Sequence, residues 1–197
     1  MARSLDAQPD HAPSLALRGA IALERGDARA AVADLERAAA IDRSAMTAWA
    51  LRDALAAAGE HDAADQVHRS IVAEGARADA RSLALYLASE RIAPDRALAL
   101  VRDELAVRSD ALTLDALAWA QAAAGASDSA QISIERALAA GAGARLYYHA
   151  GSIAESRGDA QAALEWLDKA YQHKHTLLPS EKAGLFDSLC RLEAARC

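Results

Sequence analysis

Apolar residues recur at helical spacing along most of the chain, and short breaks interrupt them at regular intervals. In the first stretch Leu15 and Leu23 share one face of a helix, and Gly26–Asp27 ends the pattern. A second apolar stripe at the same spacing follows, from Ala31 to Ala39. The pattern therefore predicts two helices that are joined by a tight turn.

The break recurs with a period of 33 residues, at Gly26, Gly59, Gly125 and Gly158. Ile92 occupies the remaining slot and is followed by Ala93–Pro94. Self-similarity at this period is typical of stacked supersecondary units. An alanine stands five residues after every slot: Ala31, Ala64, Ala97, Ala130 and Ala163. We place five units at 12–44, 45–77, 78–110, 111–143 and 144–176.

The residues at each turn have separate local roles. Glycine suits the left-handed position that ends a helix. Asp27 and Asp159 can cap the second helix of their units by accepting backbone N–H bonds. Pro94 fits the first turn of a helix, where no N–H is required. The recurring alanine allows the two helices of a unit to approach closely.

The two ends of the chain fall outside the units. Residues 1–11 are predicted to be a disordered tail, and 177–197 an amphipathic helix that caps the array. Leu178-Pro179-Ser180-Glu181 is a helix-start signal. Both cysteines are expected in this helix, where Cys190 and Cys197 would lie roughly 10 Å apart, too far for a disulfide. We expect Cys190 to be buried.

Two units carry a recognisable motif. One has Tyr147, Ala150-Gly151, Ala154, Gly158-Asp159, Ala163, Leu167 and Ala170, and the other has Leu15, Arg18-Gly19, Gly26-Asp27, Ala31, Leu35 and Ala38. This pattern resembles the tetratricopeptide repeat, in particular repeats of bacterial members, over about residues 12–176. The period is 33 rather than 34, and the proline that usually ends the second helix is absent, so another α-solenoid remains the alternative. The resemblance implies an all-α, right-handed solenoid of five helix–turn–helix repeats with a C-terminal capping helix.

In tetratricopeptide arrays the first helix of each unit lines a concave groove. The positions that the resemblance assigns to this groove hold several aromatic and polar residues: Trp49, Asp53, Tyr86, Asp115, Trp119, Arg145, Tyr148, His149, Ser152 and Glu155. Tryptophan and tyrosine offer a large contact area with one polar group, which suits a binding surface. Two interpretations stay open: the rings bind an extended or helical peptide, or they pack between neighbouring helices.

Composition and charge also indicate which classes of partner to expect. The chain has 55 alanines and a net charge of −6, with basic residues scattered among acidic ones. This distribution argues against nucleic acid and anionic membranes as partners. No apolar run is long enough to insert into a membrane. Acidic groove positions, among them Asp53 and Asp115, favour a partner with basic residues.

Catalysis and cofactor binding have no support in the sequence. It contains no nucleophile elbow, phosphate-binding loop or zinc spacing. His173 and His175 would point apart on a helix, so we expect no metal site. The chain has no asparagine, and its three lysines lie near its end, so the carboxylate clamp of some tetratricopeptide domains is not carried over.

We therefore expect a protein-interaction module that binds a peptide or protein segment in the concave groove, with no enzymatic activity and no cofactor. The alternative is a structural element that forms homo-oligomers without a groove ligand. A start without an apolar core segment, MARSLDAQPD, predicts a cytoplasmic protein, with a periplasmic mature form as the alternative. The chain could also be one part of a longer repeat protein.

Overall fold

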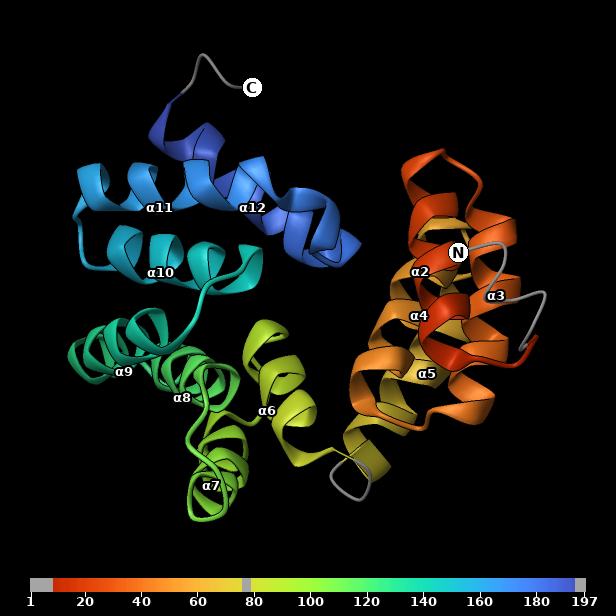
Figure 1. Ribbon diagram of the computed structural model, residues 1–197, viewed down its shortest axis with the longest axis horizontal. Coiled ribbons are helices and arrows are strands. Elements are labelled where there is room, and N and C mark those ends of the chain that lie inside the picture. The colour runs from red at the N-terminus through yellow and green to blue at the C-terminus, as the bar shows by residue number, and fades with distance from the viewer. Residues whose placement is uncertain (1–8, 76–78, 194–197) are drawn as a thin grey trace. The chain divides into compact units, whose positions relative to one another are not determined.

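The computed structural model describes residues 9–75 and 79–193, and every regular element in these ranges is a helix (Figure 1). The expected all-α class is confirmed. The elements are α2 (Ala12–Glu24), α3 (Ala28–Ile41), α4 (Ala45–Ala57), α5 (His61–Glu74), α6 (Ala80–Ser89), α7 (Pro94–Leu105), α8 (Ala111–Ala123), α9 (Ser127–Ala140), α10 (Ala144–Ser156), α11 (Ala160–Gln172), the 3₁₀ turn η2 (Lys174–Thr176) and α12 (Pro179–Leu192).

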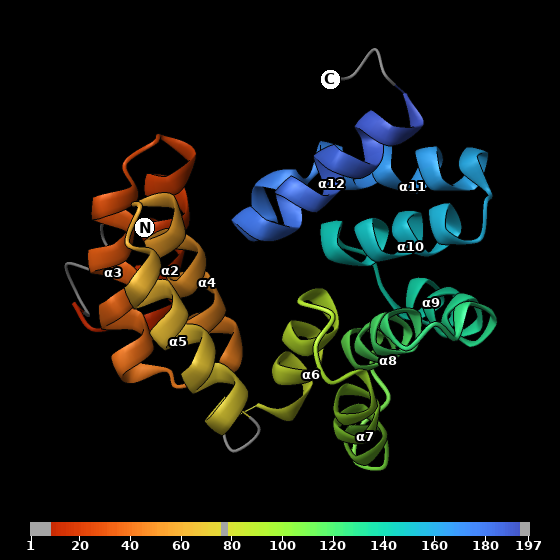
Figure 2. The ribbon, with the colours of Figure 1, turned by 180° about the vertical axis from the view of Figure 1, so that it is seen from behind.

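Consecutive helices pack as pairs. α2 lies against α3, α4 against α5, α8 against α9, and α10 against α11, and the last pair lies side by side in both views (Figures 1 and 2). Helices that pack in sequential pairs are the architecture of an α-solenoid. The first helices of four units begin at residues 12, 45, 111 and 144, where the repeat places them, and α6 begins at Ala80.

The chain divides into two compact units, residues 1–83 and 84–197. In the first unit, leucines of α3 and α4, Leu35, Leu51 and Leu55, pack with the alanines of α3 and α5. In the second unit, Leu114 and Ile134 form a core with α10 residues. Each of the two compact units therefore has its own apolar core.

Four turns use the predicted glycine. Gly26, Gly59, Gly125 and Gly158 have φ between 77 and 81°. The Asp27 side chain accepts the Ala30 N–H at 3.1 Å, and the Asp159 side chain accepts the Ala162 N–H at 3.0 Å. Both predicted caps are therefore confirmed.

The third turn is built differently. Pro94 opens α7, as predicted, but the left-handed residues are Arg91 (φ 54°) and Ala93 (φ 46°). The Ile92 N–H donates to the Leu87 carbonyl at 2.9 Å, the bond that closes a helix C-terminus around a left-handed residue. The left-handed position has therefore moved one residue ahead of the slot, from 92 to 91.

The recurring alanines lie inside the helix pairs. Four of them are fully buried and Ala64 is 5% exposed. In the last pair, α10 approaches α11 closely at Gly151, where an added Cβ would lie 2.6 Å from Leu167 Cγ. Small residues therefore set the spacing of the pair α10/α11, as the repeat pattern predicts.

The C-terminal segment departs from the expectation in two ways. Helix α12 ends at Leu192 and Glu193 is extended, so helical spacing does not apply as far as Cys197, which lies outside the described residues. Cys190 is disulfide-bonded, so the expectation of no disulfide was wrong. Phe186 on α12 is 41% exposed, and its ring meets Tyr171 edge-on at 5.8 Å.

Candidate functional site

The predicted groove residues fall into both units. Trp49 and Asp53 lie on α4 in the first unit, and both side chains are buried. The other eight belong to the second unit: Tyr86, Asp115, Trp119, Arg145, Tyr148, His149, Ser152 and Glu155. The structure brings Asp115, Trp119, Tyr148 and His149 together, and we call these four residues the aromatic cluster.

Burial separates the predicted aromatic residues into two groups. Trp49 is 1% exposed and Tyr86 is fully buried. Trp119 and Tyr148 are only partly buried. A ring can bind a partner only where it reaches the surface, so Trp119 and Tyr148 are the binding candidates.

At the centre of the aromatic cluster is a buried polar pair. His149 Nδ1 on α10 lies 2.8 Å from Asp115 Oδ1 on α8, and each side chain is 1% exposed. Within the described chain, neither Asp115 Oδ2 nor His149 Nε2 has a hydrogen-bond partner. Buried polar atoms are usually paired, so these two mark the cluster as more than packing.

Trp119 rests on this pair. Its ring stacks on the His149 ring at 4.0 Å with the planes 10° apart, and Tyr148 meets it at 5.8 Å. The indole N–H donates to Ser89 Oγ at 2.9 Å. Stacking and the hydrogen bond together hold the ring in one orientation, which reduces the entropy lost when a ligand binds.

Two ion pairs join α10 to α12. Arg145 pairs with the buried Glu181, and Arg191 pairs with Glu155 through two bonds of 2.8 and 3.1 Å. Burial alone would lower the pKa of Arg145, but the charges of Glu181 and Asp115 raise it above its usual value. Arg145 is therefore a fixed positive charge.

Helix α12 also affects Tyr148, which its Gly184 approaches closely. Burial raises the pKa of the Tyr148 phenol, and the charge of Glu181 adds to this. The hydrogen bond with Ser152 and the charges of Arg191 and Arg91 partly offset the rise. Tyr148 therefore stays protonated at neutral pH.

The acidic residues of the predicted site are all paired. Asp53 accepts from Arg52 at 3.2 Å, Asp115 from His149, and Glu155 from Arg191. Paired carboxylates offer little net negative charge to a partner. These paired side chains therefore do not favour a partner with basic residues, contrary to the expectation from the sequence.

A surface hollow of about 240 Å³ lies beside Trp119. From the predicted set it is lined by Trp119 and Ser152, and the Ser152 hydroxyl is buried beside the Tyr148 phenol. Arg91 and Ser127, which are not among the predicted groove residues, also line it. Both stand at turns between helices, and the repeat pattern treats these positions only as breaks.

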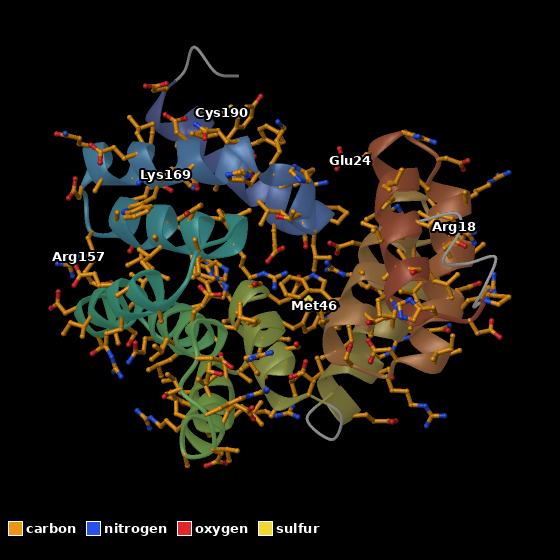
Figure 3. All side chains as sticks on the ribbon, in the orientation of Figure 1. Arg18, Glu24, Met46, Arg157, Lys169 and Cys190 are labelled. Atoms are coloured by element: carbon orange, nitrogen blue, oxygen red, sulfur yellow. The ribbon has the colours of Figure 1, made fainter. Side chains whose placement is uncertain are left out.

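His173 ends α11 and His175 lies in η2; within the described residues no three His, Cys, Asp or Glu side chains are grouped to hold a metal ion. Lys169 lies on α11 (Figure 3). Its Nζ is 3.9 Å from the centre of the Trp166 ring. Over the same ranges, every helix is too short or too polar to cross a bilayer.

Comparison with models of protein families finds no match to this chain, and comparison with curated proteins finds none either.

Proposed function

We propose that this chain is a protein-interaction module built of tetratricopeptide-like repeats. Its second compact unit, residues 84–197, binds a segment of a partner protein over Trp119. The observation that carries the proposal is the support of this ring. Stacking on His149 and the hydrogen bond to Ser89 hold it in place, yet it is only partly buried and borders a hollow.

This arrangement has the properties of a binding hot spot. Such residues are aromatic, lie next to pockets and are held by a second layer of contacts. The side chains that contact Trp119, His149 and Ser89, hold its ring in place and do not form an exposed nucleophile–base pair. We therefore propose recognition and not catalysis.

The test begins with a library of random peptides selected on the full chain. The affinity of a selected peptide is then compared for the wild type, Trp119→Ala and Trp166→Ala, with folding checked by circular dichroism. Trp166 is the matched control, because it is a partly buried tryptophan on α11 of the same unit. Loss of Trp119 should weaken binding at least about tenfold, as expected for a hot spot.

A second variant separates loss of the binding surface from loss of the fold. Ala123→Gln adds bulk in the hollow from α8, one turn after Trp119, and leaves the buried pair of Asp115 and His149 unchanged. It should weaken binding while the unfolding transition stays unchanged. Equal affinities for all four proteins would contradict the proposal.

Self-association through the C-terminal end is the alternative, and one observation favours it. Tyr171 and Phe186 are each 41% exposed and contact each other edge-on. Sedimentation of the wild type and Phe186→Glu tests this. A dimer that Phe186→Glu converts to a monomer, together with no peptide selected, would favour the alternative.

A further inference from the structure

The hollow beside Trp119 differs in charge from the rest of the chain. Its polar side chains are Arg91, Ser127, Ser152 and Ser156, and no acidic residue lines it. The remaining lining residues besides Trp119 are alanines and a glycine. On a chain with a net charge of −6, a hollow with one guanidinium and no carboxylate favours an anionic ligand.

Arg91 is held at the rim by strained backbone. Its φ of 54° is left-handed, and Ala93 at φ 46° adds a second such residue in the same turn. Four other turns use glycine in this conformation, which costs a residue with a Cβ considerably more. Strain of this kind is often retained where a side chain has a functional role.

The charge of Arg91 is free to act on a ligand. Its side chain is exposed, and within the described residues it has no ion-pair partner. The nearby carboxylate of Glu155 is held by Arg191, and that of Asp128 by Arg157. A guanidinium without a partner can form the bidentate contact that carboxylates favour.

Two further donors face the same space. Ser152 lines the hollow, and its hydroxyl, which also interacts with the Tyr148 phenol, can turn to a ligand. Helix α9 begins beside it at Ser127, and its N-cap, Ala126, supplies no side-chain cap. The first N–H groups of a helix favour negative charge.

We propose that the hollow binds the carboxylate of an aspartate or glutamate side chain in the partner segment, with Arg91 as its charge partner and Ser152 as a hydrogen-bond donor. This inference rests on the proposed function and adds the class of residue that is recognised. One guanidinium matches one carboxylate charge, whereas a phosphate would leave a net negative charge in the hollow.

The test uses the peptides selected on the wild-type chain. An acidic residue should be enriched at one position, and its replacement by the matching amide should weaken binding at least about tenfold. On Arg91→Gly the acidic and amide peptides should bind equally well. Glycine suits the left-handed backbone at this position, so this variant removes the charge without disturbing the turn.

Ala93→Gly is the matched control, because it relieves strain in the same turn and retains Arg91. It should prefer the acidic peptide as strongly as the wild type does. The preference should also fall with rising salt on the wild type and not on Arg91→Gly.

Other outcomes overturn the inference. If Arg91→Gly keeps the wild-type preference, or if selected peptides lack an acidic residue, the carboxylate site is refuted. Loss of binding in Trp119→Ala would then still support the interaction module. Stronger binding of a phosphoserine version of the peptide would assign the hollow to phosphate. A library from which the wild type selects nothing refutes both proposals.

Discussion

Asp115 and His149 lie 34 residues apart in the chain and meet through a 2.8 Å contact between Oδ1 and Nδ1, with each side chain 1% exposed. The contact ties α8 to α10 in adjacent units of the repeat. It also supports the stacked ring of Trp119, so one buried pair connects the core to the proposed binding surface.

Asp115→Ala should destabilise the chain by about 1–3 kcal/mol, because it leaves a polar ring buried without its partner. Asp115→Asn should cost less, since the amide still offers an acceptor. Urea unfolding measures both. An Asp115→Ala variant within about 1 kcal/mol of the wild type would show that water reaches the pair.

The two ion pairs between α10 and α12 should differ in strength. Glu181 is 3% exposed, pairs with Arg145 and accepts the Leu178 N–H at 2.8 Å, whereas the Arg191 side chain paired with Glu155 is 60% exposed. We expect Glu181→Ala to cost about 3–5 kcal/mol and Glu155→Ala at most about 1 kcal/mol. Urea unfolding of the two variants compares them directly, and equal losses would contradict the burial argument.

Gly151→Ala should destabilise the α10/α11 pair. The added Cβ would lie 2.6 Å from Leu167 Cγ and 3.1 Å from the Ala163 carbonyl, so the helices must separate. Overpacking of this kind costs about 1–3 kcal/mol. Thermal unfolding measures it, with Gly143→Ser as the control, because that position is open and extended and serine is a good N-cap. A variant as stable as the wild type would mean that the pair can repack.

The third turn should be more stable with glycine. Arg91→Gly relieves a left-handed residue and should raise stability by about 1 kcal/mol. Gly26→Ala makes the reverse change at φ 77° in the first turn and should lower stability by a similar amount. Thermal unfolding measures both. If the two unfolding temperatures shift in the same direction, the backbone at Arg91 is not strained.

Asp42 should contribute to stability above acidic pH. Burial alone would raise its pKa, but hydrogen bonds from Thr47 and from the Ser44 hydroxyl and N–H outweigh this and lower it. Because the folded pKa lies below the unfolded value of about 3.9, the stabilisation is present above that pH and is lost as the pH falls through the folded pKa. Asp42 is exposed, so the contribution is small.

Unfolding experiments between neutral pH and pH 3 test this prediction. Asp42→Asn should be less stable than the wild type at neutral pH, and the difference should shrink as the pH falls. A difference that does not change with pH would assign the effect to hydrogen bonding alone. The Asp27→Asn variant is a suitable comparison, because Asp27 is the N-cap of α3 and its side chain accepts a single N–H bond.

The turns and helix caps of the repeat were predictable because each depends on a few adjacent residues. Gly26 and Gly158 adopt left-handed turns, Asp27 and Asp159 cap helices, and Pro94 begins α7, as their chemistry requires. The displaced left-handed residue at Arg91 was not predictable. No local signal distinguishes a turn that is longer by one residue from one in which the glycine is simply substituted.

The sequence by itself determined the helices, their pairing and the small residues between them, because period and turn chemistry are local properties. Only the tertiary structure decided that Tyr86 is buried while Trp119 reaches the surface, and that the candidate acidic residues are already paired. Exposure and pairing depend on neighbours about 30 to 36 residues away, such as Ser89 for Trp119 and Glu181 for Arg145. Such neighbours meet only when the helices stack.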